Sequence, residues 1–85
     1  MVTFREEVIE LLVGKVKKLR PDIDAAALNA ETRFKDDLGM KSSEIVKITV
    51  ALEDEYDVEV PFMAFNRCVT FGDAADYMSE ITGIE

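Results

Sequence analysis

Residues 36–61 of the chain read DDLGMKSSEIVKITVALEDEYDVEVP, a loop followed by an amphipathic segment with an acidic end. Apolar residues recur in this segment at three- and four-residue spacing, which predicts a helix from Ser42 to Tyr56. Val46 and Val50 are expected on the flank of that helix rather than in its buried face. Gly39 is expected to adopt a backbone angle that other residues resist, and so to turn the chain into the helix.

The N-terminal sequence predicts another helix, from Phe4 to Leu19, with apolar residues along one face. Thr3 is a natural N-cap for it, and Glu6 is expected to complete a capping box. Pro21 then ends the helix.

The C-terminal third predicts two more helices. A short helix is expected over Pro61–Arg67, with the proline at its first position. A last helix is expected from Thr70 to Ile81, with Asp73 in the capping-box position. No strand pattern or internal repeat appears, so the sequence predicts one all-α domain over residues 1–85. Its expected architecture is a small four-helix bundle with three main helices and one short helix.

Residues 21–41 form a connection that is longer than usual between helices. A short helical turn is expected over Asp24–Leu28. Apolar residues are spaced along the connection, which indicates that it packs against the helices. These residues are Ile23, Leu28, Phe34 and Leu38.

The composition describes a folded protein, because 48% of the residues are hydrophobic and 33% are charged. The sequence contains no apolar run of eighteen residues, so no membrane span is expected. The start, MVTFREEVIE, is amphipathic and acidic, unlike a secretory signal or a transit peptide. We therefore expect a cytoplasmic monomer.

The net charge of −8 argues against nucleic acid as a partner, because phosphates require clustered lysine and arginine. It favours protein partners with basic docking patches. With no histidine and one cysteine, the chain cannot form an internal disulfide, a Cys/His zinc site or a histidine acid–base pair. We expect neither an enzyme nor a metal site.

Four motifs together resemble the acyl carrier protein family over nearly the whole chain. They are the Asp-Leu-Gly turn followed by serine at residues 37–42, the ALEDEYD run at Ala51–Asp57, the Val60-Pro61 pair, and the VTFGDAADYM segment at Val69–Met78. In that family the serine opens the second helix and is esterified with 4′-phosphopantetheine. The resemblance implies attachment at Ser42 by a phosphopantetheinyl transferase.

The family's usual Asp-Ser-Leu tripeptide reads Lys41-Ser42-Ser43 here. A serine before a helix is often a plain N-cap, which is the simpler interpretation of Ser42 taken alone. The adjacent Ser43 is the rival attachment point. The residues expected around the prosthetic group are Asp37, Leu38, Gly39, Lys41 and Ser43.

In the family, acidic residues along the second helix dock onto basic patches of partner enzymes. Lys41 and Lys47 interrupt that acidic character here, and both are spaced to pair with Glu44 along one helix face. This change predicts a specialised carrier with its own partners. The residues expected to meet a partner are Glu44, Val46, Lys47, Val50, Glu53, Asp54, Val60 and Phe62.

The third helix is unusually apolar, with Phe62, Met63 and Phe65, so at least one of these side chains is expected to line the acyl pocket or to meet a partner. Cys68 is expected to be a buried, inert thiol.

The favoured function is a carrier that holds acyl groups as thioesters for fatty-acid, polyketide or other specialised acyl-processing enzymes. An aminoacyl or peptidyl carrier, and an unmodified interaction domain with the same fold, are the alternatives.

Overall fold

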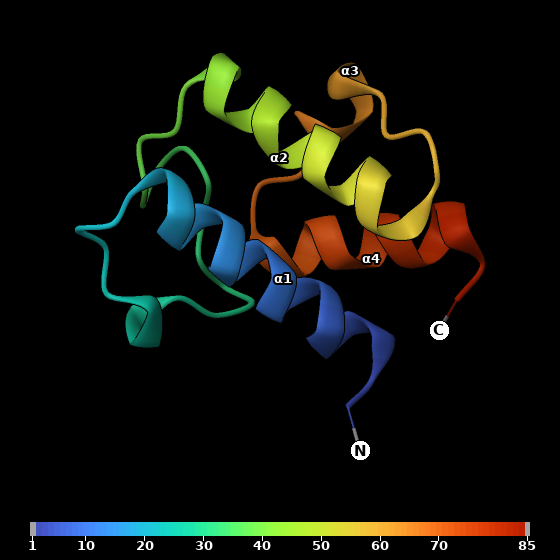
Figure 1. Ribbon diagram of the computed structural model, residues 1–85, viewed down its shortest axis with the longest axis horizontal. Helices are drawn as coiled ribbons and strands as arrows, with labels where there is room; N and C mark the ends of the chain where they lie inside the picture. Colours follow the sequence, from blue (N-terminus) through green and yellow to red (C-terminus); the bar gives the residue numbers. More distant parts are fainter. Residues whose placement is uncertain (1, 85) are drawn as a thin grey trace.

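Three long helices and one short helix surround a shared apolar core in the computed structural model, which describes residues 2–84. The elements are α1 (Phe4–Leu19), the 3₁₀ turn η1 (Ala25–Ala27), α2 (Ser42–Tyr56), α3 (Phe62–Phe65) and α4 (Phe71–Thr82). The chain direction of α1 is opposite to that of α2 and α4 (Figure 1). The all-α bundle is confirmed, and no helix in the described part is long and apolar enough to cross a bilayer.

Capping residues define where α1 and α4 begin. Thr3 Oγ1 accepts a hydrogen bond from the Glu6 N–H at 3.1 Å, but the Glu6 carboxylate binds the Thr3 hydroxyl instead of its backbone N–H. The predicted capping box of α1 is therefore only half formed. The box of α4 is complete, because Thr70 accepts from Asp73 and Asp73 accepts from the Thr70 N–H.

Two predicted helix starts were one residue too early. Pro61 and Thr70 are N-caps with extended backbone, and the helices begin at Phe62 and Phe71. The short helix also ends at Phe65 rather than Arg67. Sequence patterns place helix ends only to within a residue or two, because a cap and a first helical residue favour overlapping residue types.

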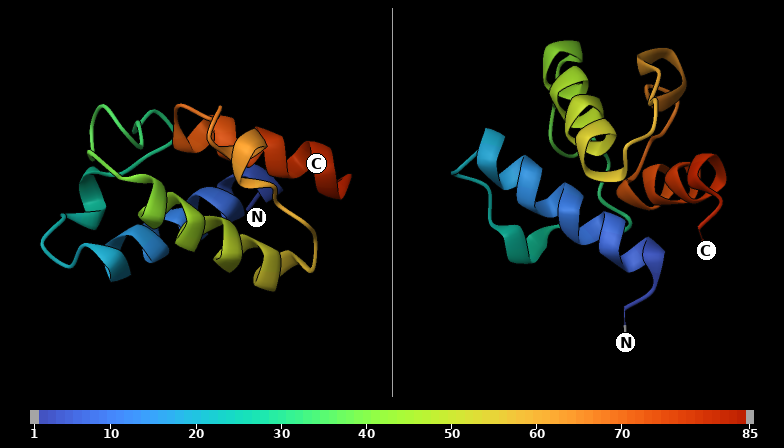
Figure 2. Two further views of the ribbon diagram at one scale, coloured as in Figure 1. Left: turned by 90° about the horizontal axis from the view of Figure 1, so that it is seen from above. Right: turned by 45° about the vertical axis from the view of Figure 1, so that its right-hand side comes forward.

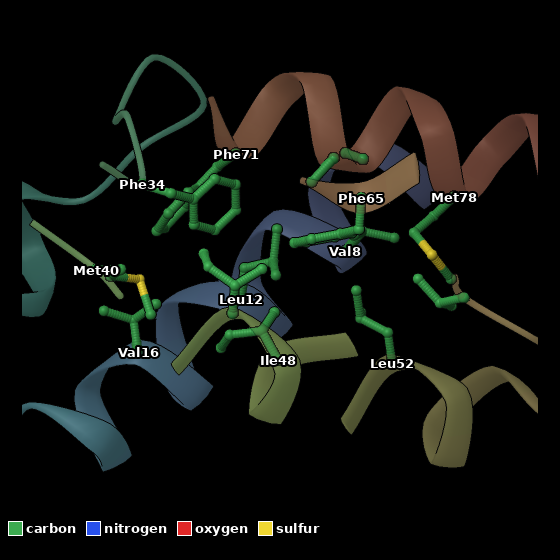
Figure 3. Close-up of a cluster of buried hydrophobic side chains, with 14 of the residues drawn as sticks. Val8, Leu12, Val16, Phe34, Met40, Ile48, Leu52, Phe65, Phe71 and Met78 are labelled. Carbon is green, nitrogen blue, oxygen red and sulfur yellow. The ribbon is translucent and has the colours of Figure 1, made fainter. Parts of the chain in front are cut away.

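The core lies between α1, α2 and α4, and α3 closes it on one side (Figures 1 and 3). Phe65 of α3 is fully buried, and its ring centroid lies 5.6 Å from that of Phe34. Phe34 in turn packs on Phe71 at the start of α4, at 4.8 Å. Aromatic pairs of this kind contribute about 0.5–1.5 kcal/mol beyond burial of their area. They tie the long loop and the short helix to the same core.

The long loop between α1 and α2 is anchored to the beginning of α4 (Figure 2). Phe34 N–H donates to the Val69 carbonyl at 3.0 Å, and Phe71 N–H donates to the Thr32 carbonyl at 3.0 Å. Gly72 N–H donates to Ala30 O at 2.8 Å. The predicted packing of the loop is confirmed: Phe34 is buried and the other three anchors are partly buried against the core. The loop therefore delivers residues 38–41 to one defined place.

Candidate functional site

Ser42 is the first residue of α2, and Lys41 is its N-cap, with extended backbone at φ −91° and ψ 164°. The plain N-cap interpretation of Ser42 is therefore wrong. Ser42 and its neighbour Ser43 are both exposed, and within residues 2–84 neither hydroxyl has a hydrogen-bond partner. Ser42 thus presents a free hydroxyl at a helix N-terminus.

The turn before Ser42 is built by three of the residues expected around the prosthetic group. Gly39 has φ +61°, in the left-handed region that the sequence predicts for it. The Asp37 carboxylate accepts from the backbone N–H of Arg33 at 2.9 Å and from its guanidinium at 3.1 Å. These bonds, the side-chain one first, lower the pKa of Asp37. Leu38 packs against the core. Asp37 and Leu38 thereby fix the shape of the turn.

Glu44 does not pair with Lys41 and Lys47 side chains, so that expectation was wrong. Its carboxylate binds the Arg20 guanidinium at the end of α1, through Arg20 Nε at 2.9 Å and Nη2 at 2.6 Å. Its Oε1 also accepts from the backbone N–H of Lys41 at 3.1 Å. The Arg20 hydrogen bond, then that of the Lys41 backbone, lowers the pKa of Glu44 to about 2. Only 20% of the Glu44 side chain is exposed, which leaves little of it for a partner.

A Glu44→Gln variant should lose the acid sensitivity that this pairing creates. Because the folded-state pKa is lowered from 4.5 to about 2, the carboxylate stabilises the fold fully above pH 4.5. That stability is lost as the pH falls from 4.5 toward 2. We expect a smaller fall in Tm over this window for Glu44→Gln than for wild type, measured by circular dichroism. Equal slopes in the two proteins would contradict this role of Glu44.

The outward face of α2 carries most of the residues expected to meet a partner. Val46 and Val50 are 42% and 48% exposed, and Lys47 and Asp54 are exposed beside them. Glu53 is partly covered, because its carboxylate accepts from the backbone N–H at position 60, at 3.0 Å.

Two apolar residues differ from the sequence-based expectation. Val60, expected at the partner surface, is 3% exposed and belongs to the core. Phe62 is half-buried against that core. Of the apolar residues on α3, Met63 is the surface residue, at 74% exposed. A helix of one turn must distribute three large side chains around itself, so the sequence could not assign each one.

A cavity of about 240 Å³ lies between the loop and the α3–α4 connection, lined by Lys35, Asp36, Asn66, Cys68 and Val69. The buried Oδ1 of Asn66 has no hydrogen-bond partner within residues 2–84. Burial first, then Asp73, raises the pKa of Cys68 to about 11, which agrees with the predicted inert thiol, but the side chain is partly rather than fully buried. Sequence analysis missed the cavity and Asn66, and no sequence pattern indicates either.

The start of α2 fits a phosphate ester on Ser42. The backbone N–H groups of Ser42 and Ser43 have no acceptor in the described part of the chain, and such groups at a helix N-terminus favour an anion. The neighbouring Lys41 is exposed and adds a positive charge. No group of three possible metal ligands is assembled within residues 2–84.

Comparison with known proteins agrees with this geometry. The family described as "Phosphopantetheine attachment site" matches residues 8–78. The chain is also 38% identical over 75 residues to an acyl carrier protein of Clostridium acetobutylicum, covering 85% of this chain and 97% of the relative. The chain belongs to the phosphopantetheine-binding family of acyl carrier proteins, and its cofactor is covalently attached 4′-phosphopantetheine. Its role is that of an acyl carrier, which interacts with a transferase and with acyl-processing enzymes.

Proposed function

We propose that Ser42 holds the phosphopantetheine arm and that this domain presents thioester-bound acyl groups to enzymes of fatty-acid, polyketide or other specialised acyl metabolism. The observation that carries the proposal is the free, exposed Ser42 hydroxyl on the first residue of α2, in a chain that belongs to a phosphopantetheine-binding family. We further propose a single-domain, cytoplasmic monomer that performs no catalysis of its own.

The chain supplies a nucleophile and a suitable surface for the attachment. The Ser42 oxygen attacks the pyrophosphate of coenzyme A on the transferase, and its proton passes to that enzyme. A phosphorus–oxygen bond forms at Ser42, and the nucleotide half of coenzyme A leaves. The Ser42 and Ser43 N–H groups at the start of α2, with the positive charge of the neighbouring Lys41, would favour the resulting phosphodiester anion. When bound, the arm supplies a thiol that carries acyl groups as thioesters.

The docking surface that we propose combines two exposed valines with charges of both signs. Val46 and Val50 provide apolar contact, while Lys47 and Asp54 flank them. A partner for this surface needs an apolar centre and at least one acidic group opposite Lys47. That requirement favours dedicated partner enzymes over enzymes whose docking patch is basic throughout and matches a uniformly acidic carrier.

Exchanging both lysines for acids should redirect the chain to a generic partner. We expect Lys41→Asp with Lys47→Glu to bind a ketosynthase with a basic docking patch about fivefold more tightly than wild type at low salt, because rim charges act through complementarity. Titration calorimetry would measure the affinities. Lys15→Asp with Lys18→Glu makes the same net charge change on α1 and serves as the control. Equal affinity of wild type and the double variant, or an equal gain in the control, would contradict a changed docking surface.

The intact mass of the chain after incubation with coenzyme A and a broad-specificity phosphopantetheinyl transferase tests the attachment. One added phosphopantetheine supports a carrier. No addition with any of several transferases would favour the unmodified interaction domain, for which the Lys41-Ser42-Ser43 tripeptide is the supporting observation. Loading of the arm with amino acids instead of acyl groups would favour the aminoacyl carrier.

A further inference from the structure

Arg20 joins three separate segments of the chain at the base of the attachment site. Its Nε and Nη2 bind the two carboxylate oxygens of Glu44 in α2, at 2.9 and 2.6 Å. Its Nη1 donates to the Leu38 carbonyl at 2.8 Å, and Nη2 donates to the Gly39 carbonyl at 3.3 Å. The backbone N–H of Arg20 itself bonds to the Val16 carbonyl at the end of α1. One guanidinium thus links α1, the glycine turn and the first turn of α2.

The contact points of Arg20 lie on both sides of Ser42 in the sequence. Gly39 precedes it by three residues, and Glu44 follows it by two. Glu44 also accepts from the Lys41 N–H, so the residue directly before Ser42 belongs to the same network. Through these bonds Arg20 ties the backbone segment that carries Ser42 to the end of α1.

The burial of this ion pair distinguishes it from the others in the described chain. The side chains of Arg20 and Glu44 are 29% and 20% exposed, against 50% and 65% for Arg5 and Asp76. A two-pronged contact with a carboxylate also requires the planar guanidinium, which lysine cannot replace. An exposed ion pair is weakened by water and by the mobility of its side chains, whereas this partly buried ion pair can hold a backbone segment in place.

We propose that Arg20 is a positioning residue for phosphopantetheine transfer, which holds the 38–44 segment so that the Ser42 hydroxyl is presented to the transferase in a reactive direction. The inference rests on the proposed attachment at Ser42. A misplaced nucleophile slows the chemical step even when binding is intact. The exposed docking residues Val46 and Val50 lie outside the hydrogen-bond network of Arg20, so binding to the transferase should persist without it.

Steady-state transfer kinetics, with the chain as the varied substrate, test this role. We expect Arg20→Met to lower kcat at least tenfold while KM changes less than twofold. Arg20→Lys keeps the charge but cannot reach all four acceptors, so it should lower kcat nearly as much. Amide exchange by NMR gives a readout independent of the transferase: the Lys41 N–H should exchange at least tenfold faster in Arg20→Met, while the α4 amides are unchanged.

Two controls separate positioning from stability. Arg20→Met with Glu44→Met removes the unpaired charge and should recover Tm without recovering kcat. Thr3→Ala removes the cap at the far end of α1 and should lower Tm with kcat unchanged. Wild-type kcat in Arg20→Met, or kcat that follows Tm across the set, would overturn the inference and leave the proposed function intact. A wild-type chain that gains no phosphopantetheine would overturn both.

Discussion

We expect Ser42→Ala to take up no phosphopantetheine under conditions that modify the wild type completely. The substitution removes the nucleophilic oxygen, and the neighbouring hydroxyl of Ser43 belongs to the second residue of α2 rather than the first. The change leaves the fold intact, because Ser42 is exposed and its side chain forms no hydrogen bond in the described structure. Intact mass spectrometry after incubation with coenzyme A and a transferase measures the result.

Ser43→Ala is the matched control for this experiment, since it deletes the same atom one residue further along. Ser43 lies one helical step, about 100°, around the axis from Ser42, so its hydroxyl points in a different direction. We expect Ser43→Ala to be modified completely. Loss of the added mass in Ser43→Ala alone would move the site by one residue, and loss in neither variant would contradict Ser42 as the required attachment residue.

Phe65→Ala should cost about 3–5 kcal/mol of the free energy of unfolding, as truncation of a buried aromatic ring does. Phe65 has no exposed surface, and its ring packs 5.6 Å from that of Phe34. A domain of this size has a total stability toward the lower end of about 5–15 kcal/mol, so the variant should be largely unfolded near 37 °C. Urea denaturation followed by circular dichroism would measure the loss.

Met63→Ala on the same short helix is the control for Phe65→Ala. Because Met63 is 74% exposed, its truncation should change the free energy of unfolding by less than about 0.5 kcal/mol. A large loss in Met63→Ala, or a negligible one in Phe65→Ala, would contradict the assignment of α3 as the cover of the core.

Local sequence predicted the helices well, because helix formation depends mainly on neighbours in the chain. The bounds of α1 and α2 follow from caps and apolar spacing within each segment, and both were predicted correctly. The left-handed backbone at Gly39 agrees with the sequence-based expectation, because glycine permits a positive φ without steric cost. Errors at Pro61 and Thr70 were limited to a single residue, where a cap and a first helical position favour overlapping residue types.

The partner of Glu44 shows where local reasoning failed. Spacing along α2 suggested Lys41 and Lys47, both within one turn of Glu44. The structure instead pairs Glu44 with Arg20, which is 24 residues away in the sequence and meets it only because α1 and α2 pack together. A partly buried, two-pronged arginine contact outweighs an exposed lysine pair of about 0.2–0.5 kcal/mol.

The sequence by itself determined a helical fold with a serine at the start of its second helix, because helix formation and capping depend on consecutive residues, and its motifs resemble those of acyl carrier proteins. The tertiary structure alone decided that Val60 is buried, that Met63 is exposed and that a cavity lies beside Asn66. It also decided that the Arg20 guanidinium donates hydrogen bonds to the turn before Ser42. Burial and long-range pairing depend on how the helices pack in space, and neither spacing nor composition specifies that packing.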